Sequence, residues 1–157
     1  MPTKTLFDLS GIDLNHVIVD QAGVRKVNPH RDHMEHLNGI VWIDTENARI
    51  IGFKDVRPDE FWVSGHIPGN PILPGVLMLE AGAQMASFYT REYIGWKGFI
   101  AFSGLEDVRF RQQVSPGVRL YLVGHILWHR HRRIACKVQG LVKGELVFEA
   151  TIIGMEL

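Results

Sequence analysis

The sequence predicts an α+β fold in which one long central helix is wrapped by a curled antiparallel β-sheet. The helical segment, from about Pro74 to Arg91, is apolar on nearly all sides, as expected of a buried helix. Six or so segments rich in β-branched and aromatic residues lie before and after it, and turn signals separate them. A chain with one such helix and many strands is typical of a helix packed on a sheet.

The first two strands are expected at residues 38–44 and 48–56, where "TEN" makes them a hairpin. A Pro/Gly-rich segment then leads to the helix, and Pro74 suits its first turn because the missing N–H has no helical partner there. The middle of the helix is thin, which lets another backbone come close; its small residues are Ala81, Gly82, Ala83 and Ala86. The later strands are expected at 98–114, 118–132, 133–144 and 145–157, with "SPG" and "KGE" as turns.

The composition indicates a single domain over residues 1–157, large enough for its own core. Seventeen Lys and Arg balance seventeen Asp and Glu, so no nucleic-acid partner is expected. Cys136 is the only cysteine, which excludes an internal disulfide and fits a reducing compartment. No segment has the pattern of a signal peptide or the length of apolar sequence that a membrane span needs. We expect a cytoplasmic protein that is not inserted in a membrane.

One window of the sequence is almost free of charge. From Phe61 to Thr90, Glu80 is the only charged residue and His66 the only other group that titrates near neutral pH. At the chain's overall 22% charged residues, about six or seven charges would be expected in these thirty positions. This depletion indicates burial, and a lone buried carboxylate is costly unless it is paired, hydrogen-bonded or neutral. A functional role for His66 and Glu80 would offset that cost.

The same window carries a specific motif. "GHIPGNPILPGVLMLEAGAQ" (65–84) resembles the signature of the 3-hydroxyacyl-[acyl carrier protein] dehydratases, a hot-dog-fold family of fatty acid synthesis. "NPHR" (28–31), "GLEDVRFRQQVSPGVRL" (104–120) and "KGELVFEATI" (143–152) resemble further blocks of that family, in the same order. Ile67 stands where the motif usually has Phe, and residues 32–38 are polar where the family is apolar. Residues 1–27 form an extension without a counterpart.

The resemblance implies a dehydratase that converts a (3R)-3-hydroxyacyl chain on acyl carrier protein to the trans-2-enoyl chain and water. His66 suits removal of the C2 proton, because a neutral imidazole is a base near working pH. Glu80 in an apolar site suits protonation of the departing hydroxyl. The free backbone N–H groups of Gly75 and Val76 at the helix start would face the thioester oxygen. Gln84, one turn after Glu80, could orient its carboxyl group.

The resemblance also implies a partner and an assembly. The partner is an acyl carrier protein whose phosphopantetheine arm holds the substrate, so the enzyme itself needs neither a metal nor an organic cofactor. Arg109 and Arg111 alternate with Phe110 and are candidates for docking that carrier. We expect a homodimer, or three such dimers, in which His66 of one chain meets Glu80 of the other. The spacing of these two residues alone does not distinguish this from a site within one chain.

Three alternatives remain beside the dehydratase. A dehydratase/isomerase of the same superfamily would carry Asp at position 80, so Glu80 argues against it. A hot-dog thioesterase would release free acid from acyl thioesters. A non-catalytic acyl-binding or scaffolding subunit would be expected to have lost His66 or Glu80. Acyl chain length and the lipid pathway are left open by the sequence.

Four other features favour structural readings. Cys136 is expected in the core, and His30 and Arg31 are expected to be structural. The three histidines of "HRDHMEH" (30–36) lack the spacing of a common metal site. The basic run "HRHRR" (129–133) is expected to be a solvated strand end and turn rather than a phosphate site.

Overall fold

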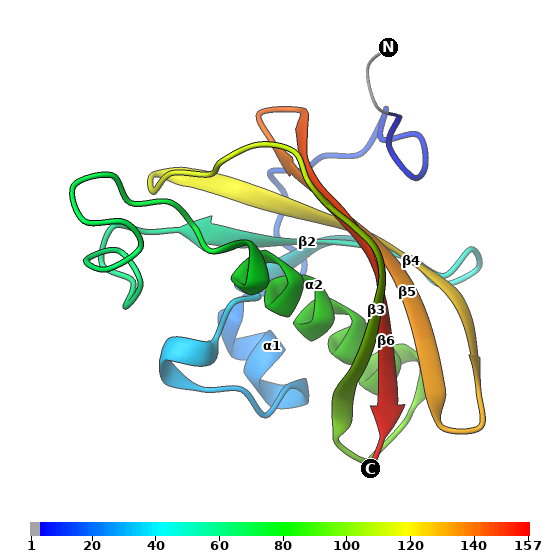
Figure 1. The fold of residues 1–157 in the computed structure, drawn as a ribbon. Coiled ribbons are helices and arrows are strands. Elements are labelled where there is room, and N and C mark those ends of the chain that lie inside the picture. Colours follow the sequence, from blue (N-terminus) through cyan, green and yellow to red (C-terminus); the bar gives the residue numbers. More distant parts are fainter. Residues whose placement is uncertain (1–3) are drawn as a thin grey trace.

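Residues 4–157 are described by a computed structural model, in which a six-stranded sheet curls around one helix (Figure 1). The helical elements are α1 (Gln21–Val27), a 3-10 turn (Asp32–Met34), α2 (Gly75–Tyr89) and a π-helical turn (Thr90–Ile94). The strands are β1 (Gly39–Asp44), β2 (Arg49–Val56), β3 (Ile100–Phe110), β4 (Val118–Arg130), β5 (Arg133–Val142) and β6 (Glu145–Glu156). These bounds confirm the predicted hairpin, the central helix and the four later strands.

The sheet is antiparallel throughout, in the order β1-β2-β4-β5-β6-β3. Its turns have the predicted chemistry: Lys143 and Gly144 both have positive φ, as the tight β5–β6 hairpin requires. The basic run at 129–133 is the exposed end of the β4–β5 hairpin, which confirms the solvated-turn interpretation. Strand β3 lies at one edge of the sheet and pairs only with β6 among the described strands.

Helix α2 crosses the concave face of the sheet, and the main core lies between the two (Figure 1). Alternate residues of each strand point toward the helix, since side chains on a strand alternate between its faces. Gly82 allows close packing, because a Cβ there would lie 3.1 Å from Val138 Cγ1 and 3.2 Å from Ile152 Cδ1. At Gly82, side chains of β5 and β6 therefore occupy the space beside the helix. This arrangement is the predicted hot-dog fold.

Residues 4–14 of the N-terminal extension cover part of the opposite face of the sheet, which the sequence did not predict. Phe7 is buried against a second, smaller apolar cluster of the outer face, made of Val41, Ile51, Phe53, Val123 and Leu141. The buried side chain of Gln139 holds this segment at both ends of its amide, accepting from Leu6 N at 2.8 Å and donating to Lys4 O at 3.1 Å. The sheet therefore has an apolar core on each face.

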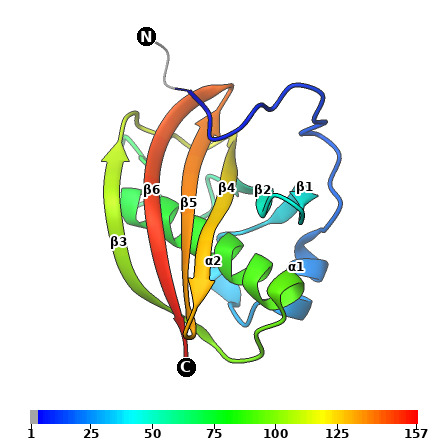
Figure 2. The ribbon, with the colours of Figure 1, turned by 90° about the vertical axis from the view of Figure 1, so that its right-hand side faces the viewer.

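Beyond this cover, the chain reaches the β1 edge of the sheet and then α1 (Figure 2). Residues 18 and 19 hydrogen-bond with Ile40 of β1, and Asp20 caps α1 by accepting from Gly23 N at 2.9 Å. Helix α1, with seven residues, was not predicted. No helix within residues 4–157 is long and apolar enough to cross a membrane.

Candidate active site

Helix α2 presents free backbone donors at its start. Neither Gly75 N nor Val76 N donates a hydrogen bond to any acceptor within residues 4–157, as expected for the first turn of a helix. The ring of Phe110 on β3 packs directly on Gly75, where a Cβ would lie only 2.7 Å from Phe110 Cε1. Val76 is 68% exposed, so this end of the helix is not buried within one chain.

Glu80 is held in a defined orientation one turn further along. The Gln84 side-chain amide donates a 2.9 Å hydrogen bond to Glu80 Oε1, as the sequence predicted from their spacing. Glu80 keeps 23% of its side chain exposed, whereas Gln84 is buried. No hydrogen bond to Glu80 Oε2 is found in the described part of the chain, which leaves this oxygen available to a substrate.

Gln84 is itself fixed by the polar segment 28–38, which wraps around it. Its Oε1 accepts from the backbone N–H groups of His36 (2.9 Å) and Leu37 (3.1 Å), and its Nε2 also donates to Met34 O. The Asn28 side chain donates to the Gln84 carbonyl at 2.9 Å. Both donors and both lone pairs of the amide are thus engaged, so Gln84 has only one orientation available.

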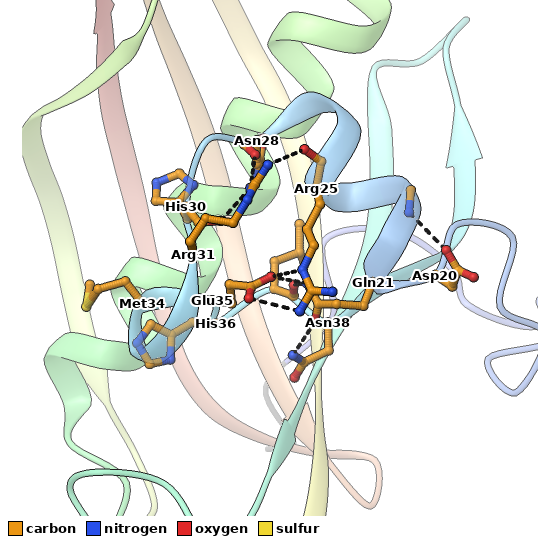
Figure 3. Close-up of polar contacts among 12 residues, drawn as sticks. Asp20, Gln21, Arg25, Asn28, His30, Arg31, Met34, Glu35, His36 and Asn38 are labelled. Atoms are coloured by element: carbon orange, nitrogen blue, oxygen red, sulfur yellow. Dashed lines mark hydrogen bonds and ion pairs between the residues drawn. The ribbon is translucent and has the colours of Figure 1, made fainter.

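Figure 3 shows the polar contacts that hold segment 28–38 against α1. Arg31 donates to the carbonyl oxygens of Arg25, Asn28 and His30, which confirms its structural role. Arg25 pairs with Glu35, with Nε 2.7 Å from Glu35 Oε2. The polar residues of 32–38 are therefore structural partners of α1 and Gln84.

An apolar pocket of about 120 Å³ opens beside Glu80. Its walls come from one face of α2, from β3 and from the ends of β5 and β6; besides Glu80 they include Ala83, Ser87, Ile100, Phe102, Ile134 and Ile152. Glu80 is the acidic residue among those that line the pocket. A carboxylate at the mouth of an apolar pocket is suited to proton transfer on a ligand with an apolar tail.

His30 also lines this pocket, which sequence reasoning missed. His30 Nε2 lies 3.8 Å from Glu80 Oε1, and its Nδ1 is buried without a hydrogen-bond partner in the described chain. Burial lowers the pKa of His30, which keeps the ring neutral near pH 7 despite the neighbouring carboxylate. The structural reading of His30 is therefore incomplete. The "NPHR" block was the available signal for it.

His66 lies in the loop 57–74, which extends beyond the start of α2 (Figure 1). Its Nδ1 is 2.6 Å from the carbonyl oxygen of Ile72, and the Ile72 N–H donates to the His66 carbonyl at 2.8 Å. Because a carbonyl only accepts, Nδ1 carries the proton and Nε2 keeps a free lone pair. The loop thus fixes the tautomer that a general base requires.

One expectation about this window needs correction. Helix residues 78–90 are mostly buried as predicted, but residues 64–70, including His66, are exposed in the single chain. The pocket that contains Glu80 does not include His66, and no hydrogen bond or ion pair joins the two within residues 4–157. One chain therefore does not bring His66 and Glu80 together, an outcome that the spacing of the two residues had left open.

The other candidates from the sequence, Arg109, Arg111 and Cys136, lie outside the Glu80 pocket. Arg111 is engaged by Glu149, with Nη2 2.9 Å from Oε2, whereas Arg109 is exposed and has no ion pair in the described chain. Cys136 is fully buried, and burial raises the pKa of its thiol to about 12, which excludes a nucleophilic role. No three potential metal ligands converge within residues 4–157. The rings of His30 and His36 face Glu80 and Lys54 respectively.

This chain is similar in sequence to a known family and to several known proteins. A model of the FabA-like domain matches residues 28–151. A 3-hydroxyacyl-[acyl-carrier-protein] dehydratase FabZ from Desulfotalea psychrophila is 33% identical, over 86% of this chain and 91% of that protein. The FabZ of Paramagnetospirillum magneticum is 34% identical, over 100% of this chain and 98% of that protein.

Solved structures share the fold at lower identity. A chain of the dehydratase heterocomplex ApeI:P from Xenorhabdus doucetiae superposes with a TM-score of 0.71 at 16% identity, over 85% of this chain and 90% of that one. Cj0977, a sigma28-regulated virulence protein from Campylobacter jejuni, gives 0.67 at 18% identity, over 93% and 96%.

Proposed function

This chain belongs to the FabA-like domain family, and we propose that it removes water from 3-hydroxyacyl chains on acyl carrier protein in fatty acid biosynthesis. The observation that carries this proposal is the Glu80 carboxyl group, clamped by Gln84 at the mouth of an apolar pocket. His66, Glu80 and the first N–H groups of α2 are the groups that would perform the reaction.

His66 is the proposed general base. Its Nδ1–H donates to Ile72 O, so Nε2 accepts the C2 proton of the substrate. The imidazolium that forms keeps its hydrogen bond to the carbonyl, which holds the ring in place and stabilises the charge. General acid–base assistance of this kind contributes about 10²- to 10⁴-fold in rate.

Glu80 is the proposed general acid. Protonated Glu80 donates to the C3 hydroxyl as the C3–O bond breaks, so that water leaves rather than hydroxide. The carboxylate that remains keeps the Gln84 N–H on Oε1, and His30 Nε2 is 3.8 Å away. Transfer of the proton from His66 to Glu80 would restore the starting state. The sum is a substrate converted to the enoyl chain plus one water.

The start of α2 is the proposed oxyanion site. Removal of the C2 proton places negative charge on the thioester oxygen, and the free N–H groups of Gly75 and Val76 are donors that could receive it. The helix dipole adds to their effect. The Phe110 ring on Gly75 shields this end of the helix from water on one side.

The pocket between α2, β3 and β6 is the proposed site for the acyl tail. Its lining is almost wholly apolar beyond Glu80, His30, Gln84 and Ser87. The substrate's phosphopantetheine arm would then run outward to the carrier protein. Arg109 is the better candidate for docking this acidic partner, because Arg111 is already paired with Glu149. The reaction itself calls for no metal or organic cofactor, and we place it in the cytoplasm.

We further propose that the active site is shared between two copies of the chain. His66 is exposed and lies outside the pocket of its own Glu80. Large apolar side chains are exposed around it and along the edge strand β3; they include Ile67, Val76, Phe102, Leu105 and Phe110. An unpaired strand edge and a large exposed apolar surface are typical of a protein–protein interface. A two-fold dimer would cover both and bring each His66 loop to the partner's Glu80.

The reaction is tested by incubating the purified protein with 3-hydroxyacyl carrier proteins of graded chain length. Mass spectrometry should show loss of one water from the carrier-bound chain, and the reverse hydration should occur with the enoyl substrate. Release of free acid with a free carrier thiol would instead identify a thioesterase. Binding without turnover at any chain length would identify a non-catalytic subunit. Either result would refute the dehydratase proposal.

A further inference from the structure

A buried lysine on β2 contacts both the segment that holds Gln84 and the loop that carries His66. Lys54 on β2 is 1% exposed, and its Nζ lies 2.5 Å from Glu60 Oε1 and 3.2 Å from His36 Nδ1. Burying an ammonium group in a sheet is unfavourable unless charge and hydrogen-bond partners compensate it. Burial also lowers the pKa of His36 to about 4, so its ring is neutral and Nδ1 can accept from Lys54.

Glu60 connects Lys54 to the loop that carries His66. Glu60 Oε2 accepts from Arg57 N at 2.9 Å, and the Glu60 carbonyl accepts from Val63 N at 3.2 Å. The Trp62 carbonyl then accepts from His66 N at 2.8 Å. The six residues after Glu60 thus form consecutive turns, the first of which is hydrogen-bonded to Glu60. Residues 64–70 of this loop are exposed, so they gain little support from packing.

His36 connects Lys54 to Glu80. The backbone N–H of His36 donates to Gln84 Oε1, and the same amide donates to Glu80 Oε1. Because the His36 ring contacts Lys54 while its backbone contacts Gln84, the position of the ring fixes the position of the amide clamp. Figure 3 shows His36 on the segment that wraps around α2.

We infer that Lys54, together with Glu60 and His36, is a positioning residue that ties the His66 loop and the Glu80 clamp to one point on β2. This inference rests on the proposed function of His66 and Glu80. It explains why the chain keeps a buried charged cluster in which a polar atom remains unsatisfied: His36 Nε2 is buried without a partner in the described chain. Such atoms cost stability, so the cluster is poorly suited to a purely structural role.

The shared-site dimer gives this cluster a second consequence. Each Lys54 would support the His66 of one active site and the Glu80 of the other. A single Lys54 lesion in one protomer of a mixed dimer should therefore slow both sites.

The test compares the double variant Lys54→Met/Glu60→Gln with the wild type. Replacing both partners avoids leaving an unpaired buried charge, which would unfold the protein. Urea unfolding should show that the variant is folded under assay conditions. We expect kcat to fall by about 10- to 100-fold while KM changes less than about threefold, because misplacing a catalytic group by about 1 Å is costly.

Arg119→Gln is the matched control. It removes the ion pair with Asp55 (Nε–Oδ1 2.7 Å), the next residue on β2, whose side chain points to the opposite face of the strand from that of Lys54. It should leave kcat within about twofold, because the pair is partly exposed and contacts neither proposed catalytic side chain. The second readout is amide hydrogen exchange at Gly65 and His66, which should quicken in the double variant while β4 and β5 amides stay protected.

The outcomes separate the two proposals. A wild-type protein that does not dehydrate its substrate refutes the proposed function, whatever the variants do. A wild type that dehydrates, with a folded double variant that retains kcat within twofold and unchanged exchange at Gly65 and His66, refutes the positioning role. Loss of kcat with faster loop exchange supports it, because a merely structural role would lower activity only with the folded fraction.

Discussion

The side-chain amide of Gln84 is bonded at all four of its hydrogen-bonding positions, and one of these bonds holds Glu80 Oε1 at 2.9 Å. The two residues lie one helical turn apart on α2, so a helix places the carboxyl group and its clamp together. The polar segment 28–38 supplies the other partners. The geometry of the proposed general acid is thus set by a segment about fifty residues away in sequence.

Replacement of Gln84 by Leu should therefore affect both stability and activity. It leaves the N–H groups of His36 and Leu37 without their acceptor, which should lower the free energy of unfolding by about 1–3 kcal/mol. It also removes the hydrogen bond that orients the Glu80 carboxyl group, and we expect kcat to fall by at least about tenfold. Gln139→Leu is the control, since Gln139 is an equally buried glutamine on the other face of the sheet. It should lower stability and leave the kcat of the folded protein unchanged.

His66→Ala and Glu80→Gln should each abolish most of the dehydration and hydration activity. Each group is expected to supply about 10²-fold or more in rate. His66 is exposed and Glu80 half-buried, so neither replacement should disturb the fold, as circular dichroism and urea unfolding would verify. More than about a tenth of the wild-type activity in either folded variant would be incompatible with the assigned roles.

Inactive chains of the two kinds should complement each other if the site is shared. His66→Ala and Glu80→Ala chains, refolded together, pair at random, so half of the dimers are mixed and each of these has one intact site of two. Activity should return to roughly a quarter of wild type. Mixed dimers that form, as shown with differently tagged chains, but remain inactive would place each site within one chain.

Replacing Arg109 and Arg111 by Ala should weaken the use of carrier-linked substrate. We expect a higher KM and a weaker salt dependence, because exposed charges mainly steer the encounter with a charged partner. Most of the effect should come from Arg109, since Arg111 is paired with Glu149. A short thioester mimic without the carrier serves as the control substrate. Equal losses on both substrates would indicate a structural role for the two arginines.

His36 should make the protein less stable as the pH falls. Its pKa is about 4 in the folded state and near 6.5 in the unfolded chain, so the unfolded state takes up the proton first. Stability is lost as the pH drops below about 6.5 and levels off below about 4, by up to about 3 kcal/mol. Urea unfolding of His36→Leu should show a flatter pH dependence than wild type. Parallel curves for wild type and His36→Leu would contradict this.

The sequence predicted the strands and α2 because their signals are local. Turn residues such as Lys143 and Gly144 mark the hairpins, and apolar residues on all sides mark a buried helix. Helix α1 was missed because seven residues are too few for a clear periodic pattern. The segment that covers the outer face was missed because its apolar residues are isolated in the sequence. Gln139 gave no signal either, because only the structure shows that its side chain bonds to the backbone of Lys4 and Leu6.

The candidate site was predictable only in part. His66, Glu80 and Gln84 were found from charge depletion and helical spacing, both of which are readable in one segment. The contact of His30 with Glu80 and the Lys54 cluster join segments far apart in sequence, which no local pattern reports. Charge depletion was read as burial within the chain, but residues 64–70 are exposed. A surface that another chain covers must also avoid charge, so depletion alone does not separate the two cases.

The N-terminal cover has a consequence for how copies of this protein can associate. Helix α2 packs on the inner face of the sheet, residues within 4–14 pack on the outer face, and residues 18 and 19 pair with Ile40 of the edge strand β1. The other edge strand, β3, has no second partner strand in the described chain. If two copies joined β3 to β3, each molecule would use up this edge in the contact. Pairing of that kind would be closed and self-terminating, whereas pairing of β3 with a different edge could continue from molecule to molecule.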